Sequence, residues 1–432
     1  MNSFTRLLIA SRRALGSLFV VVVVVAASLP LHAEEVAPEA EIIAKAQAIH
    51  GDALVFDAHA DIVIPSTSLS YLGEGGVSKV SPEKLAAGGV NAVVMSVAVG
   101  PGPRTAEGDA EARALAEEKL AVALELVNAS DGDVVLATSA AELEAAKADG
   151  KPAIILGFQN ARSLEGDVST IDHFYAAGVR VFGLNHLGHN DFSDSSRPLY
   201  DGATKSYEPR EEHGGLSPLG IAAIERINAL GGVVDISQMS KAAALQAISL
   251  SKSPIIASHS NVRAISNVTR NLSDEEIDFI GEKGGVIHVA AFGAYLVALS
   301  DPDLLERVKA VRVKAGLPEA YSYPYELYWE LEDPAAQRAF LLEMRSTIGR
   351  GSVSDMIAHI DYIVDRIGID HVGIGNDFNH GSSIEGYADA SEALNVTIAL
   401  VRAGYSAEDI QKIWGGNFQR VFREAERRTT VH

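Results

Sequence analysis

The chain of 432 residues carries a formal net charge of −21, with 47% hydrophobic and 22% charged residues and no cysteine. This length fits one large barrel domain, and the composition is that of an ordinary globular protein with a sizeable core. The lack of cysteine excludes disulfides and thiolate metal ligands, and the acidic balance argues against nucleic acid or anionic lipid as a partner.

The first 33 residues have the pattern of an export signal. Residues 6–13 contain three arginines, residues 16–28 form an apolar run, and Leu31-His32-Ala33 offers a cleavage site. Because this segment holds three arginines and no acidic residue, the remaining chain carries a charge of −24. We expect residues 1–33 to be a signal peptide and the mature protein, 34–432, to be exported to the periplasm or the exterior without a membrane span. A retained N-terminal anchor is the alternative.

Short β-branched or apolar runs recur along the mature chain and predict eight strands. These runs are Ala53–Asp57, Val90–Ser96, Ala153–Gly157, Val179–Asn185, Gly232–Ile236, Pro254–Ser258, Gly284–Val289 and His371–Gly375. Helical patterns separate most of them, at Ala110–Val127, Pro218–Leu230, Asp274–Glu282 and Val353–Ile367. Strands that alternate with helices indicate a parallel sheet. Eight units predict a single (β/α)8 TIM-like barrel. An open doubly wound sheet would carry a glycine-rich loop after its first strand, where this chain has "AHADIV".

The stretch "ALVFDAHADIV", residues 53–63, ends a buried strand with polar side chains. His59 and Asp61 are two positions apart, so both project from the same side of the strand. An imidazole and a carboxylate directed at one point form half of a metal site. The alternative is a core histidine with a satisfied hydrogen bond.

Polar residues able to bind a ligand follow six of the eight predicted strands. They are His59 and Asp61, Gln159-Asn160, Asn185-His186, Ser237-Gln238, Ser258-His259-Ser260 and Asn376-Asp377. In a barrel, the carboxyl ends of the strands lie on one rim, where active sites are built. We therefore expect a metal or catalytic site there.

About eighty residues separate the seventh and eighth predicted strands, far more than one helix needs. This insertion contains the aromatic cluster Tyr321–Glu330. Aromatic residues dominate both pockets and interfaces, so a lid or pocket wall and a packed extension or subunit contact both remain open.

Several motifs together resemble the membrane (renal) dipeptidase family of the metal-dependent amidohydrolase superfamily. They are "DAHADI", "GVRVFGLNHLGHNDFSDS", "GGLSPLGIAAIERINALGGVVDIS", "ASHSNVRAISNVTRNLSDEEI" and "IDHVGIGNDF". The resemblance extends from Asp57 to Phe422 and implies a (β/α)8 barrel, a zinc site and hydrolysis of dipeptides with a free C-terminal carboxylate. It also implies a homodimer.

The resemblance assigns roles to individual residues. His59 and Asp61 match metal ligands on the first strand, and His259 matches a histidine ligand of a second zinc ion. Asp377 matches an aspartate that touches the first metal and the attacking water.

Two further residues match groups that contact the substrate. His186 matches a histidine that stabilises the oxyanion, and Arg270 matches an arginine that holds the substrate carboxylate through two parallel hydrogen bonds. From the residues alone, Arg270 before "NLSDEE" also fits a salt bridge at a helix start.

Two positions depart from the family pattern. Gln159 stands where the family has a glutamate that bridges two zinc ions, and Gln238 stands where it has a histidine. A neutral amide is a weak ligand for zinc, which prefers imidazole nitrogen and carboxylate oxygen. We therefore expect one firmly bound Zn²⁺ and a weakened second site, with His380 as a candidate for an extra ligand.

Three functions are consistent with these residues. The first is an exported zinc-dependent dipeptidase. The second is a non-hydrolytic descendant that binds or remodels a peptide-like ligand on the same barrel, and the third is a single-metal hydrolase with a changed substrate.

Overall fold

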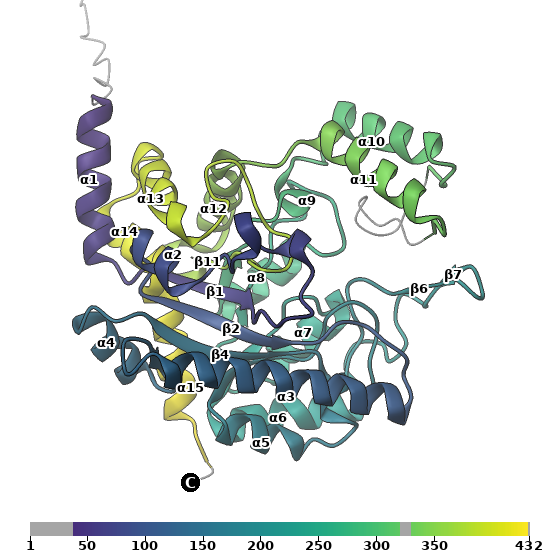
Figure 1. Cartoon of the computed structure of the whole chain (residues 1–432), viewed down its shortest axis with the longest axis horizontal. Helices are drawn as coiled ribbons and strands as arrows, with labels where there is room; N and C mark the ends of the chain where they lie inside the picture. The colour runs from purple at the N-terminus through teal and green to yellow at the C-terminus, as the bar shows by residue number, and fades with distance from the viewer. Residues whose placement is uncertain (1–37, 320–329, 431–432) are drawn as a thin grey trace, which may run out of the picture. The chain divides into compact units, whose positions relative to one another are not determined.

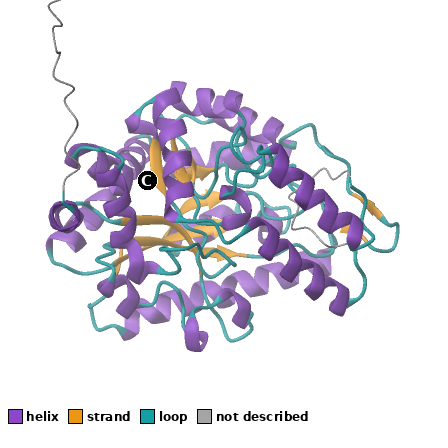
Figure 2. Ribbon diagram, turned by 90° about the horizontal axis from the view of Figure 1, so that it is seen from above, coloured by secondary structure: helices purple, strands orange, loops and turns teal. Residues whose placement is uncertain are grey.

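The computed structural model describes residues 38–319 and 330–430, and Glu39–His432 form one compact unit. Eight parallel strands pair in the order β1-β2-β4-β5-β8-β9-β10-β11. Their bounds are Phe56–Asp61, Ala92–Ala98, Ala153–Gln159, Val179–Gly183, Val233–Asp235, Ile256–Ala257, Val286–Val289 and Val372–Ile374. Helices surround these strands (Figures 1 and 2), so the predicted (β/α)8 barrel is confirmed.

The barrel closes between its first and last strands through the residues that follow β11. Ala60 and Phe378 form a parallel bridge, with the Asp61 amide donating to the Phe378 carbonyl at 2.9 Å. The amide of Asp377 donates to the carbonyl of His59 at 3.0 Å. Closure therefore brings the polar end of β1 against the polar residues after β11.

Apolar side chains fill the amino-terminal end of the barrel. Phe56 from β1 stacks on Phe418 at 4.1 Å between ring centroids, and Phe422 packs beside Phe418. Both of these partners belong to α15 (Asn417–Arg427), which lies in one buried cluster with residues from seven barrel strands. The polar rim is therefore the opposite, carboxyl-terminal end.

The helices begin and end where their sequence signals predict. Three of the predicted ranges coincide with α6 (Pro218–Leu230), α8 (Asp274–Glu282) and α12 (Val353–Ile367), and the fourth lies within α3 (Ala106–Ala129). At α6, the Ser217 side chain accepts from the Gly220 amide, and Gly231 ends the helix with a φ of 80°. The other helices that cover the barrel are α1 (Glu39–Asp52), α2 (Pro82–Ala87), α4 (Ala140–Ala148), α5 (Thr170–Ala176), α7 (Lys241–Leu250), α13 (Ala393–Arg402) and α14 (Ala407–Gln411).

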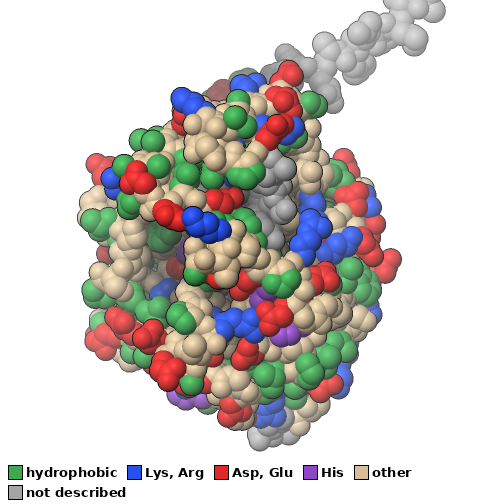
Figure 3. Space-filling view, turned by 90° about the vertical axis from the view of Figure 1, so that its right-hand side faces the viewer, with side chains coloured by type: hydrophobic (Ala, Val, Ile, Leu, Met, Phe, Trp, Pro, Cys, Tyr) green, Lys and Arg blue, Asp and Glu red, His purple; other side chains and the backbone are tan. Residues whose placement is uncertain are grey.

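The long insertion between β10 and β11 contains α9 (Gly293–Leu296), α10 (Pro302–Lys314), α11 (Pro334–Ile348) and α12. Helices α10 and α11 pair around a small core of their own, which includes Val308 and Phe340. They lie on the same side of Figure 1 as the hairpin of β6 (Tyr200–Asp201) and β7 (Ser206–Tyr207). Acidic and basic side chains are interspersed over this face (Figure 3).

Two other sequence predictions fall largely outside the described residues. The export signal, residues 1–33, does so entirely, and the aromatic cluster Tyr321–Glu330 does so except for Glu330. None of the helices in the described ranges is long and apolar enough to cross a membrane. A two-residue strand, β3 (Val135–Leu136), pairs with the start of β4 and was not predicted.

Candidate metal centre

The rim of the barrel gathers the residues that the sequence singled out. His59 and Asp61 lie on β1, and Gln159 ends β4. The others follow β5, β8, β9 and β11, namely His186, Gln238, His259 and Asp377. All of these side chains are buried, with exposed fractions between 1% and 6%. Burial of so many polar groups at one rim requires mutual satisfaction or a ligand.

Buried nitrogen and carboxylate atoms face one another at the centre of this rim. Nε2 of His59 lies 3.5 Å from Oδ1 of Asp61 and 3.8 Å from Oδ1 of Asp377. Neither Nε2 of His59 nor Oδ1 of Asp61 has a hydrogen-bond partner among the described residues. Two unsatisfied ligand atoms this close fit a divalent ion, because imidazole nitrogen and carboxylate oxygen are its preferred ligands.

His259 lies in the same cluster but has a different hydrogen-bond environment. Ligand atoms of His59, His259 and Asp377 all lie within 4.8 Å of one another, and the His59 and His259 rings stack at 3.9 Å. By distance alone, His259 could share one metal ion with His59 and Asp377. Its Nε2 atom, however, already faces Nε2 of Gln238 at 3.3 Å and Nε2 of Gln159 at 3.4 Å. Of these two imidazoles, only His59 therefore has a buried Nε2 atom without a hydrogen-bond partner within the described ranges.

Burial and neighbouring charges shift the pKa values of these groups. Burial opposes the charged form of His59, but the neighbouring carboxylates of Asp61 and Asp377 outweigh it and raise the pKa of His59. Burial alone would raise the pKa of Asp61, whereas Lys119 and His380 hold it well below the usual range. Burial raises the pKa of Asp377. Of the two carboxyl groups, Asp377 is therefore the better proton acceptor.

Asp57, which precedes His59 on β1, supports the site through hydrogen bonds to the backbone around it. Its carboxylate accepts from the His59 amide at 3.1 Å and from both the amide and the side chain of Asn376 at 2.8 Å. Burial raises the pKa of Asp57 to about 6. These bonds tie β1 to the loop after β11 and hold the backbone of Asp377, which has a φ of 61°.

Arg270 is buried beside the centre, in the wall formed by the loop after β9. It donates to Oγ of Ser260 at 3.0 Å and to the carbonyl of His259, and it lies 5.5 Å from the ring centroid of Tyr295. No carboxylate of the described residues pairs with it, so the interpretation of Arg270 as a helix-start salt bridge is wrong. The start of α8 is capped instead by Ser273 and Glu276.

A cavity of about 300 Å³ adjoins the centre and is lined by Asp61, His186, His380 and Lys119, with apolar walls from neighbouring loops. His380 contacts Asp61 through Nδ1 at 3.1 Å and faces Nε2 of His186 at 3.3 Å. The side chain predicted as an extra ligand therefore links these two residues. A cavity of this size suits a small-molecule ligand.

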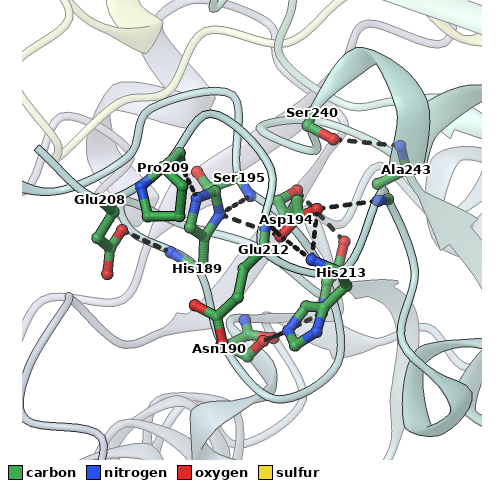
Figure 4. A network of polar contacts seen from close by, with 12 residues as sticks. His189, Asn190, Asp194, Ser195, Glu208, Pro209, Glu212, His213, Ser240 and Ala243 are labelled. Carbon is green, nitrogen blue, oxygen red and sulfur yellow. Dashed lines mark hydrogen bonds and ion pairs between the residues drawn. The ribbon is translucent and has the colours of Figure 1, made fainter.

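The long loop between β5 and α6 is fixed by buried polar contacts (Figure 4). Asp194 accepts from the amides of Glu212, His213 and Gly215 at 2.9–3.1 Å. His189 accepts from the Ser195 amide at 3.0 Å and bonds to the Pro209 carbonyl at 2.7 Å. This network fixes the loop segment that carries His186 and Arg197.

Sequence reasoning missed three residues of the site. Lys119 reaches the rim from α3, where Nζ donates to the Ala98 carbonyl at 2.7 Å and lies 3.7 Å from Oδ2 of Asp61. Arg197 donates to Oε1 of Gln238 and to the hydroxyl of Tyr295, each at 2.6 Å. A lysine in a helix and an arginine in a loop carry no local signal of such a position, whereas Tyr295 follows the predicted strand Gly284–Val289 and so lies on the rim side of the sequence pattern.

Comparisons with known proteins agree with this geometry. Dipeptidase tcpJ of Claviceps purpurea is 28% identical over 278 residues, and dipeptidase aclJ of Aspergillus oryzae is 27% identical over 280 residues. Each alignment covers 64% of this chain and 52% of the relative, so the chain spans about half the length of these fungal proteins.

Two solved structures show the same fold. PvdM of Pseudomonas aeruginosa, named a probable dipeptidase, is 33% identical with a TM-score of 0.80, covering 90% of this chain and 100% of that one. A metallopeptidase of Rhodobacter sphaeroides, liganded with a phosphinate mimic of the dipeptide L-Ala-D-Ala, is 21% identical with a TM-score of 0.64 and coverage of 86% and 99%. A family model described as membrane dipeptidase (peptidase family M19) matches residues 43–431. The chain therefore belongs to the membrane dipeptidase family, peptidase family M19.

Proposed function

We propose that this protein is an exported metallo-dipeptidase that cleaves short peptides with a free C-terminal carboxylate at a single Zn²⁺ ion. The observation that carries the proposal is the pair of buried, unsatisfied ligand atoms, Nε2 of His59 and Oδ1 of Asp61, beside the carboxylate of Asp377. The mixed nitrogen and oxygen set suits zinc, and it also admits other divalent ions.

A divalent ion bound by His59, Asp61 and Asp377 would supply Lewis acidity and lower the pKa of a water ligand to about 7. Asp377 takes the proton of the attacking water and passes it to the leaving amine. Its raised pKa favours this role, because a proton acceptor works best when its pKa approaches the working pH.

In this proposal, His186 stabilises the oxyanion. Burial, with His380 and Arg197, holds its pKa well below the usual range, so the imidazole is neutral and carries one proton. Burial opposes protonation of His380, but Asp61 raises the pKa of His380 above its ordinary value. A protonated His380 donates to Nε2 of His186, which leaves the His186 proton on Nδ1. That atom is buried and has no partner among the described residues, so it can donate to the substrate.

Arg270 binds the C-terminal carboxylate of the substrate. Its guanidinium is buried, pairs with no described carboxylate and has an unsatisfied Nε atom. A buried guanidinium without an anion is costly, and a carboxylate ligand removes that cost. The dipeptide mimic held by the Rhodobacter sphaeroides relative is consistent with this substrate class.

A panel of dipeptides, their C-terminal amides and longer peptides, assayed with protein of known metal content, tests the proposal. We expect hydrolysis of dipeptides that depends on about one equivalent of metal and on the free carboxylate. Metal-loaded protein that cleaves none of the panel would refute it. Sizing by light scattering tests the predicted homodimer.

One observation favours a second candidate, a non-hydrolytic protein that binds a peptide-like anion. Three cationic side chains, Lys119, Arg197 and Arg270, surround the centre and are all buried. Tight binding of uncleaved dipeptide to metal-free protein would support this candidate, and loss of binding without metal would exclude it.

A further inference from the structure

A directed chain of hydrogen bonds runs through His259. The Arg197 guanidinium can only donate, so the atom of Gln238 that lies 2.6 Å from it must be the amide oxygen. The amide nitrogen of Gln238 therefore faces Nε2 of His259, at 3.3 Å. Arg197 therefore fixes the orientation of the Gln238 amide, so that the amide nitrogen faces His259.

The other side of the His259 ring fixes its proton. The Asp235 carboxylate accepts from the Ser258 amide at 2.9 Å and from the Ser258 hydroxyl at 2.6 Å. Because the single hydroxyl proton of Ser258 points to Asp235, Oγ of Ser258 must accept from Nδ1 of His259, at 2.7 Å. The proton of His259 is therefore on Nδ1, and Nε2 carries only a lone pair.

The lone pair on Nε2 is the atom that a metal ion would need. In the structure it accepts from Gln238, and the amide nitrogen of Gln159 lies 3.4 Å away. The positive charge of Arg197 is adjacent, because its guanidinium binds the same amide. A cation near His259 would have to displace the amide and tolerate the guanidinium.

Arg197 is held firmly in this position. Its side chain is 7% exposed, donates to the Tyr295 hydroxyl at 2.6 Å and lies 5.8 Å from the ring centroid of Tyr295. No carboxylate of the described residues pairs with it, so its charge is not cancelled locally. The loop that carries it is fixed by the contacts of His189 and Asp194.

We infer that Arg197 is a positioning residue that restricts the centre to one metal ion, because it holds Gln238 against His259 and adds a positive charge beside that imidazole. The inference deepens the proposed function and rests on it for the presence of the first ion. The charge of the guanidinium opposes the binding of a second cation beside His259.

Metal titration of purified protein, followed by elemental analysis, tests the inference with a readout independent of turnover. The double variant Gln159→Glu/Gln238→His supplies a carboxylate and an imidazole, which are strong zinc ligands. We expect wild type and this variant each to bind about one equivalent of Zn²⁺, because the charge of Arg197 remains beside His259 after Gln238 is replaced. Adding Arg197→Met should raise the count to about two, with second-site affinity at least tenfold higher. Adding Arg197→Lys instead should give a smaller gain, since that residue keeps the charge.

Two equivalents in the double variant alone, or one equivalent in the triple variant, would overturn the role of Arg197. Arg226→Met in the double-variant background is the matched control, because it removes a guanidinium that pairs with Asp172 on the outer helices. Metal-free wild-type protein should also show the Nδ1–H tautomer of His259 by ¹⁵N NMR. The Nε2–H tautomer would contradict the hydrogen-bond directions given above. If wild-type protein bound no metal, the proposed function would be refuted. The tautomer of His259 would still test whether Arg197 and Gln238 hold its Nε2 atom as an acceptor.

Discussion

Oδ1 of Asp377 lies 3.8 Å from Nε2 of His59, although the two residues belong to opposite ends of the barrel's strand order. Pairing of β1 with the segment after β11 creates this proximity, and the amide of Asp377 bonds directly to the carbonyl of His59. The same backbone pairing therefore closes the barrel and brings these two side chains together.

Asp377→Asn should lower kcat by roughly 10²–10⁴-fold, because the amide cannot accept the proton of the attacking water. Metal content should fall less than activity, since His59 and Asp61 remain. Activity assays paired with metal analysis check this. Asp365→Asn, at an exposed position of α12, is the control and should change neither quantity.

Arg270→Lys should remove the preference for a free C-terminal carboxylate. Loss of a charge-assisted, two-point contact costs about 1.5–3 kcal/mol, so kcat/KM for dipeptides should fall roughly 10–150-fold. The ratio of rates on a dipeptide and on its C-terminal amide measures the effect. An unchanged ratio would show that Arg270 does not read the carboxylate.

Lys119→Met should tighten metal binding. The ammonium group lies 3.7 Å from Oδ2 of Asp61 and competes electrostatically with a cation on the same carboxylate. Removal of one such charge is worth about 1 kcal/mol, or roughly a fivefold lower metal Kd. Lys119→Arg retains the charge and should leave the Kd near the wild-type value. Weaker binding by the methionine variant would count against this electrostatic picture.

Stability should rise with pH between about 4 and 6.5. Burial lowers the pKa of His359 to about 4, while Nδ1 accepts from the Val262 amide and Nε2 bonds to the Leu296 carbonyl. The unfolded chain binds the proton in this window and the folded protein does not, so the free energy of unfolding increases as pH rises. A shift of this size corresponds to roughly 3 kcal/mol.

Urea unfolding at several pH values measures this slope. The His359→Leu variant should be less stable at neutral pH, because it leaves two buried backbone groups unpaired, and its slope should be shallower. If the variant kept the full wild-type dependence of the free energy of unfolding on pH, groups other than His359 would be responsible for it. His288, whose pKa burial also lowers to about 4, is the first of these.

Export predicts a defined mature terminus. Protein isolated after expression of the full chain should begin at Glu34, which intact mass measurement determines. A mass that includes residues 1–33 would favour the retained anchor.

The strand and helix periodicity predicted the barrel because each unit is encoded locally. The rim residues were also predictable, since His59, His259 and Asp377 each follow an apolar strand. Lys119 and Arg197 were not, because their positions depend on packing of α3 against β2 and on the path of the β5–α6 loop. The effect of Gln238 was predicted only as the loss of a ligand. Its role as a cap on His259 depends on Arg197, which no local pattern connects to it.

Anomalous scattering at the zinc edge from a crystal grown with Zn²⁺ counts and locates the metal ions at the rim of the barrel. We expect one peak within bonding distance of His59, Asp61 and Asp377, with Gln238 still against His259. Two peaks, a peak bound to Nε2 of His259, or no peak at the rim would contradict it.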